Sequence, residues 1–123
     1  CNPPFFENSL KSPSQERTTA RHNITLPYEL LFSKASELLA THGFFTVIVP
    51  TQFQNKLLQH ANKNELFVQR TCLVYSVLGK SSKRILMQFG FTEVLTTIEE
   101  LIIMDENGAY SPKMQELTAD FYL

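Results

Sequence analysis

The sequence predicts an α/β fold from two segments with different hydrophobic patterns. Residues 26–62 contain a helix, a buried strand and a second helix in succession, which is typical of α/β units. Two β-rich runs follow, residues 66–78 and 84–91, and the short polar linker between them predicts an antiparallel hairpin. We therefore expect residues 1–123 to form one domain or part of one, with a sheet that finishes in a hairpin.

The first helix is expected over residues 26–42. Pro27 suits its first turn, because a first-turn backbone N–H has no partner in the helix, and Gly43 is placed to end it. The apolar stripe of this helix would consist of Leu31, Ala35, Leu38 and Leu39.

The strand after this helix is a continuous apolar run over residues 44–49, closed by Pro50. A run without alternation is typical of a strand buried on both faces, so we expect a parallel strand here. Thr51 and Gln54 have the spacing of a capping box, which predicts a second helix from there to about residue 62.

The C-terminal region is expected to form a small strand–turn–helix appendage. Residues 100–104 predict a short strand, 105–108 a tight turn and 109–110 the returning strand. Ser111 is placed to cap a final helix that starts at Pro112. The apolar stripe that we expect to dock on the sheet contains Met114, Leu117 and Phe121.

Composition indicates a reduced, cytoplasmic protein. The chain is 43% hydrophobic and 19% charged, with no apolar run long enough to cross a membrane and no secretory signal pattern. Its two cysteines, Cys1 and Cys72, form neither a disulfide framework nor a metal-ligand spacing, so we expect no metal. Residues 1–92 carry a net charge of +5 and residues 93–123 carry −6, a basic body compatible with an RNA-facing surface.

The N-terminal stretch Cys1-Asn2-Pro3-Pro4-Phe5-Phe6 is stiff and oriented. Each proline fixes its own φ and restricts the preceding residue, so Asn2 and Pro3 are held extended. The Asn2 side-chain oxygen and the Pro3 carbonyl are then two acceptors beside an aromatic face. Such a corner suits a planar group that carries an NH2. A polar loop over residues 7–25 follows, and a loop of this length beside such a corner is expected to face the substrate.

Asn-Pro-Pro-Phe resembles motif IV of the S-adenosylmethionine-dependent amino-methyltransferases, which modify planar nitrogens of adenine, cytosine or glutamine. Other parts of the chain resemble one group within them, the bacterial tRNA(Val) adenine-N6-methyltransferases. These parts are Ala20-Arg21-His22, the strand from Gly43 to Val49-Pro50, the hairpin and the tail over residues 117–123. The resemblance covers essentially the whole chain.

The resemblance implies a fold, a reaction and a site. The fold would be the C-terminal half of a Rossmann-like class I methyltransferase sheet, S-adenosylmethionine the cofactor and tRNA the partner. Asn2 and Pro3 would be catalytic, accepting hydrogen bonds from the adenine NH2. The substrate-binding residues would be Pro4, Phe5, Phe6, Arg21 and His22, with Phe5 stacked on a flipped base and Arg21 and His22 as candidates for phosphate contact.

The chain also departs from this family. Its four glycines are not spaced as a nucleotide-binding turn, and in the family the cofactor-binding part precedes motif IV. We therefore expect the intact protein to methylate, and this fragment alone to be inactive and to self-associate through an exposed sheet edge. Alternatives are a protein glutamine or DNA amino-methyltransferase, which share the corner, and a non-catalytic RNA-binding module.

Overall fold

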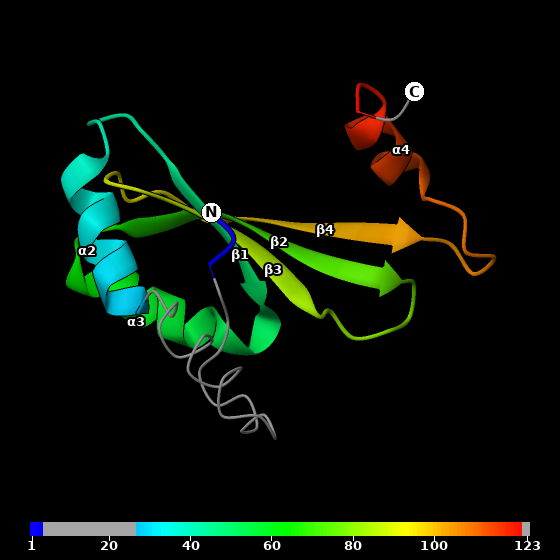
Figure 1. Cartoon of the computed structure of the whole chain (residues 1–123), viewed down its shortest axis with the longest axis horizontal. Helices are drawn as coiled ribbons and strands as arrows, with labels where there is room; N and C mark the ends of the chain where they lie inside the picture. The colour runs from blue at the N-terminus through cyan, green and yellow to red at the C-terminus, as the bar shows by residue number, and fades with distance from the viewer. Residues whose placement is uncertain (4–26, 122–123) are drawn as a thin grey trace, which may run out of the picture.

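The computed structural model describes residues 1–3 and 27–121, which form a four-stranded sheet flanked by helices (Figure 1). The strand order is β1-β3-β2-β4. The α/β class predicted from the sequence is confirmed. In chain order the elements are α2 (Tyr28–Leu38), β1 (Phe45–Pro50), the 3-10 helix η1 (Thr51–Phe53), α3 (Gln54–Lys63), β2 (Phe67–Val77), β3 (Arg84–Gly90), β4 (Thr97–Met104) and α4 (Pro112–Thr118).

The predicted hairpin is present, because β2 and β3 pair antiparallel. β3 also pairs antiparallel with β1, with Pro50 opposite Arg84 at one end and Phe45 opposite Phe89 at the other. β1 and β2 therefore point in the same direction, with β3 between them. The parallel neighbour that the sequence predicts for β1 is therefore not β3, which pairs with it antiparallel. A continuous apolar run indicates that both faces of a strand are buried, but it does not determine whether the neighbouring strand is parallel or antiparallel.

β4 extends the sheet beyond β2, and it pairs with β2 in parallel. The strand was predicted at residues 100–104, and it begins three residues earlier, at Thr97. The predicted tight turn is confirmed, since the Gly108 N–H donates to the Asp105 carbonyl at 3.2 Å and Gly108 adopts φ +83°. The expected returning strand is reduced to one isolated bridge between Met104 and Tyr110. Long-range pairing with β2 therefore replaces the local hairpin.

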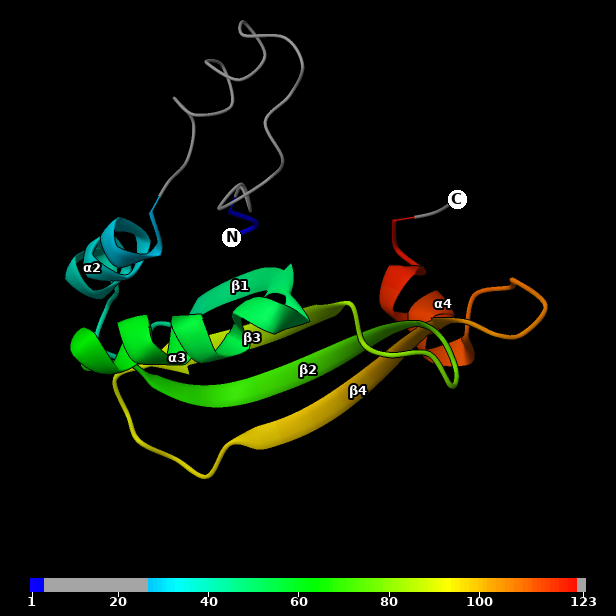
Figure 2. The same ribbon diagram turned by 90° about the horizontal axis from the view of Figure 1, so that it is seen from below.

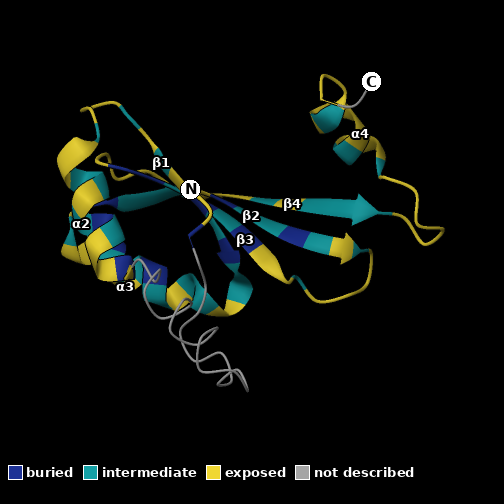
Figure 3. Cartoon of the chain, viewed as in Figure 1, coloured by how far each residue is buried: buried dark blue, intermediate teal, exposed yellow. Residues whose placement is uncertain are grey.

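The hydrophobic core lies between the sheet and the two helices α2 and α3. Figure 2 shows these helices on one face, and Figure 3 shows the buried residues gathered there. The Phe32 ring is fully buried and meets the rings of Phe45 and Phe89 edge-on, at centroid distances of 5.3 and 5.2 Å. The buried cluster contains Tyr28, Phe32, Val47, Val49, Leu57, Ala61, Leu66, Ile85, Met87 and Phe89.

Helix α2 ends four residues earlier than predicted, at Leu38, because Leu39 takes an extended conformation (φ −72°, ψ 129°). Of the predicted apolar stripe, Leu31 and Leu39 pack against the core as expected. Leu38 was expected to face the core and is 84% exposed, whereas Tyr28 and Phe32 are buried. The aromatic residues fill the space above β1 and β3, and this sets the rotation of the helix.

The predicted capping box at Thr51 is absent. Thr51 lies in η1, and α3 begins after Phe53 without a side-chain cap. The Thr51 hydroxyl instead donates to the Ser82 carbonyl at 3.2 Å. A contact with a residue 31 positions away in the chain has no local sequence signature.

The final helix starts as predicted, because the Ser111 hydroxyl accepts from the Met114 backbone N–H at 3.1 Å and Pro112 occupies the first turn. The expected docking of its apolar stripe is wrong for Leu117 and Phe121. Leu117 is 54% exposed and Phe121 is 83% exposed, so α4 buries little of that stripe against the described part of the sheet.

Candidate active-site corner

The described part of the predicted corner, residues 1–3, lies against the outer edge of β1. The Cys1 nitrogen donates to the Thr46 carbonyl at 2.7 Å, and the Ile48 N–H donates to the Cys1 carbonyl at 3.0 Å. These two bonds place Cys1 opposite Val47 in the pattern of a parallel strand pair. The chain at Cys1 therefore runs in the direction of β1, on the edge that β3 does not use.

Asn2 and Pro3 continue from Cys1 toward the carboxyl end of β1. Asn2 is exposed and Pro3 is buried, so the proline holds the corner while the amide of Asn2 stays accessible. In open α/β sheets, ligands bind at the carboxyl ends of the strands. Asn2 therefore lies at the edge of the sheet where a substrate is expected.

The other predicted site residues lie outside the described part of the chain. Their roles are not tested by the structure and stay predictions. They are Pro4, Phe5, Phe6, Arg21 and His22.

The linker between β2 and β3, residues 78–83, lies at the same end of β1. The Thr51 N–H donates to the Lys83 carbonyl at 3.2 Å, and the Thr51 hydroxyl lies 3.2 Å from both the carbonyl and the hydroxyl of Ser82. Sequence reasoning missed this contact. The polar composition of the linker indicated a turn, but only the register of β1, β3 and β2 brings Thr51 and Ser82 together.

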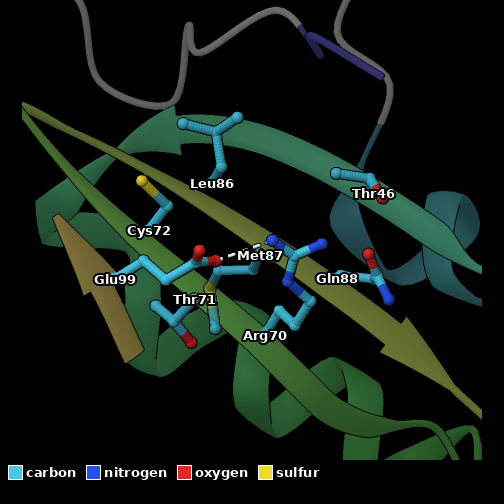
Figure 4. Close-up of a pocket in the computed structure, with 8 residues that line it drawn as sticks. All are labelled: Thr46, Arg70, Thr71, Cys72, Leu86, Met87, Gln88 and Glu99. Atoms are coloured by element: carbon cyan, nitrogen blue, oxygen red, sulfur yellow. Dashed lines mark hydrogen bonds and ion pairs between the residues drawn. The ribbon is translucent and has the colours of Figure 1, made fainter. Parts of the chain in front are cut away.

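A shallow pocket lies on the sheet face opposite α2 and α3, and Figure 4 shows the eight residues that line it. The Arg70 guanidinium and the Glu99 carboxylate form an ion pair of 2.8 Å there. Burial raises the pKa of the Cys72 thiol, and the nearby Glu99 carboxylate raises it by a smaller amount. A thiol with a raised pKa is a poor nucleophile at neutral pH. The pocket is part of an uncovered sheet face, and it reaches the corner at Thr46, whose carbonyl accepts from the Cys1 nitrogen.

Within residues 1–3 and 27–121, no group of three or more His, Cys, Asp or Glu side chains could hold a metal ion. Of the helices in these ranges, none has the length and apolar character needed to span a bilayer.

The fold is similar to that of a solved protein structure. A solved structure described as a predicted O-methyltransferase from Agrobacterium tumefaciens matches with a TM-score of 0.67 at 17% sequence identity. The match covers 75% of this chain and 45% of that one. At this identity the likeness concerns the fold alone. It agrees with the architecture that the sequence resemblance implied.

Sequence comparison gives the closer resemblance. Proteins named tRNA1(Val) (adenine(37)-N6)-methyltransferase are 36% identical in Bacteroides thetaiotaomicron, over 122 residues, and 37% identical in Photobacterium profundum, over 124 residues. Both matches cover at least 99% of this chain and 52% of the relative. The chain therefore spans about half the length of these curated relatives. No protein-family model matches the chain. The resemblance to the tRNA(Val) adenine methyltransferases is confirmed.

Proposed function

We propose that the protein containing this chain methylates N6 of an adenine in tRNA, with this chain as the C-terminal part of its methyltransferase domain. The observation that carries the proposal is the Asn2-Pro3 corner at the carboxyl end of β1, in a chain similar to tRNA adenine methyltransferases over nearly its full length. We place the reaction in the cytoplasm, with its tRNA substrate.

The chemistry of the corner requires hydrogen-bond acceptors. The Asn2 side-chain oxygen and the Pro3 carbonyl would each accept one N–H of the adenine NH2, which orients the nitrogen lone pair toward the incoming methyl group. Acceptors fixed in this geometry also stabilise the positive charge that develops on the nitrogen. Because Pro3 is buried, the corner is positioned before the substrate binds, and little reorganisation is needed.

The remaining roles follow the resemblance. Phe5 would stack on the flipped adenine, a contact of about 1–3 kcal/mol, and Phe6 and Pro4 would form the wall beside it. Arg21 and His22 would contact phosphates. S-adenosylmethionine would supply the methyl group when bound. The described residues offer no glycine-rich turn for its nucleoside. We therefore assign to them only the binding of the adenine that receives the methyl group.

The structure supports a domain completed by further chain. The outer edge of β1 already makes two backbone bonds with Cys1 in a parallel pattern: the Thr46 carbonyl accepts from the Cys1 nitrogen, and the Ile48 N–H donates to the Cys1 carbonyl. A strand leading into Cys1 would continue that ladder. Such a strand, with helices from the same segment, would also cover the open sheet face around Cys72 and Leu86, as in doubly wound sheets. We propose that this segment holds the cofactor and that the 123-residue chain alone is inactive.

The test is methyl incorporation into unmodified tRNA by the intact protein. Asn2→Ala is expected to lower the rate at least 100-fold and to leave tRNA binding within about twofold, because the amide acts on the NH2 in the transition state. Asn2→Asp keeps an acceptor oxygen and is expected to retain more activity than Asn2→Ala.

Equal loss of binding and catalysis in Asn2→Ala would mean that the corner has a structural role. An intact protein that binds tRNA but methylates neither tRNA, DNA nor a glutamine-containing protein would instead favour the RNA-binding module. Transfer to DNA or to glutamine alone would replace the tRNA assignment with one of the other amino-methyltransferases.

A further inference from the structure

The segment between Glu65 and Glu93 contains four cationic residues and no acidic ones. Arg70, near one end of the hairpin, is in an ion pair with Glu99. The other three cationic residues lie at the opposite end, where β2 turns into β3. They are Lys80, Lys83 and Arg84, and all three are exposed. We name residues 78–84 the basic loop.

The basic loop is held in one conformation by its own hydrogen bonds. The Ser82 hydroxyl lies 3.1 Å from the Val74 carbonyl and 2.9 Å from the Arg84 carbonyl. The Lys83 N–H donates to the Val74 carbonyl at 3.3 Å, and Gly79 adopts φ +80° to make the turn. A loop that is ordered in the free protein loses little conformational entropy when it binds a partner.

The basic loop is next to the Asn2-Pro3 corner, although the two are far apart in the sequence. Thr51, which follows β1 directly, is bonded to Lys83 and Ser82, and the last residue of β1, Pro50, pairs with Arg84. The corner lies on the other edge of the same strand. Neighbouring strands are about 4.8 Å apart, so the corner and the first residues of β3 are separated by roughly 10 Å across the sheet.

We propose that the basic loop binds the RNA backbone, with the Lys80 and Lys83 ammonium groups contacting phosphates that flank the adenine in the corner. This inference rests on the proposed function and adds a second contact surface to it. Among the described residues neither lysine has an ion-pair partner, so both charges are available to a phosphate. A lysine ammonium is a point charge that does not read base identity.

The position of the basic loop beside the corner favours RNA over an acidic protein segment, because the proposed substrate of the corner carries phosphates on both sides of its adenine. Asp105 and Glu106 lie in the turn after β4, on the side of the basic loop away from β1. Their carboxylates repel any anionic partner, so a partner bound to the basic loop is favoured on the β1 and β3 side, toward the corner. A nucleotide strand with its adenine in the corner takes that course, with its neighbouring phosphates over the basic loop.

The test uses the intact protein and unmodified tRNA, with affinity measured by fluorescence anisotropy between 50 and 300 mM salt. The variant is the double substitution Lys80→Gln and Lys83→Gln. The matched control is Lys63→Gln, which removes an exposed lysine at the end of α3, where β2 begins, at the opposite end of the sheet. Thermal unfolding of all three proteins is expected to coincide, because the substituted side chains are exposed.

Each lost phosphate contact is expected to reduce the slope of log K against log salt by about 0.7–0.9, so the double variant loses about 1.4–1.8. Extrapolated from 1 M salt, where the counterion contribution vanishes, affinity at 0.1 M salt would fall roughly 25- to 60-fold. KM is expected to rise by a similar factor with kcat within about twofold, since flanking phosphates do not react. Lys63→Gln is expected to leave all three quantities unchanged.

An unchanged salt slope in the double variant would overturn the proposal, as would an equal change in Lys63→Gln or the absence of tRNA binding by the unsubstituted protein. Failure of the proposed function gives a different result. In that case the unsubstituted protein would bind tRNA without methylating it, and the double variant would still lose its share of the salt slope.

Discussion

Pairing of the outer edge of β1 in the intact protein can be tested with one substitution, Ile48→Pro. The Ile48 N–H donates to the Cys1 carbonyl at 3.0 Å, so it points away from β3. Along an antiparallel pair, successive N–H groups point to opposite sides, so the neighbouring Val49 N–H points toward β3. Proline at position 48 therefore removes a donor from the outer edge and leaves the β1–β3 ladder intact, and proline is tolerated at such positions.

The expected loss has two contributions. The missing hydrogen bond costs about 0.5–1.5 kcal/mol, and the Cys1 carbonyl left without its donor adds to this, for a total of about 1–2 kcal/mol. The loss of the isoleucine side chain is measured separately with Ile48→Ala. In a protein about twice the length of this chain, the difference between the two variants corresponds to a Tm lower by about 2–8 °C in Ile48→Pro.

The assay is thermal unfolding of the intact protein, followed by circular dichroism, with Val49→Pro as the positive control for a broken β1–β3 ladder. Val49→Pro is expected to prevent folding or to lower the Tm by far more than either Ile48 variant. If Ile48→Pro is no less stable than Ile48→Ala, the edge of β1 is unpaired in the intact protein, and the reasoning about the corner is refuted.

Two further predictions concern the 123-residue chain. Light scattering is expected to give a mass above the monomer value of 14.1 kDa, because the outer edge of β1 can pair with a second chain. Ile48→Pro is expected to reduce this association. A monomer at all concentrations would contradict pairing at that edge. Because burial and Glu99 raise the pKa of the Cys72 thiol, the thiolate forms only at higher pH, so alkylation of Cys72 should keep accelerating above the ordinary thiol pKa of about 8.5. Glu99→Gln should shift that profile to lower pH, as followed by mass spectrometry, and an unshifted profile would exclude the carboxylate as a cause.

The parts of the fold that the sequence predicts correctly are those with local signals. The β2–β3 hairpin has two β-rich runs around a short glycine-containing linker, and its pairing follows from their proximity. The start of α4 has Ser111 followed by Pro112, and the structure uses both as predicted. Neither feature depends on residues far along the chain.

The predictions that are wrong concern long-range contacts. Residues 91–96 carry the chain from β3 past β2, so that β4 pairs with β2 in parallel. No periodicity in the sequence indicates this pairing. Thr51 has the spacing of a capping residue, but the register of three strands provides it with Ser82 instead. Leu117 follows the spacing of a buried stripe, yet the described part of the sheet offers α4 no surface that covers it.

The candidate site was predicted in part. The sequence indicated Asn2 and Pro3, because prolines restrict the backbone whatever the tertiary context. The basic loop beside them could not be assigned with the same reasoning. The charges of Lys80 and Lys83 are visible in the sequence, but their position next to the corner depends on β3 lying between β1 and β2.

The position of β3 also affects how this chain folds during synthesis. β1 ends at Pro50, but its partner β3 begins only at Arg84, so β1 leaves the ribosome well before the strand that pairs with it. At about 5–20 residues per second, this interval lasts roughly 2–7 s. During that time the run Phe45–Pro50 has no partner on the β3 side, and it is an exposed apolar segment of high β-propensity. Nascent β1 is therefore a segment that a ribosome-associated chaperone is expected to bind.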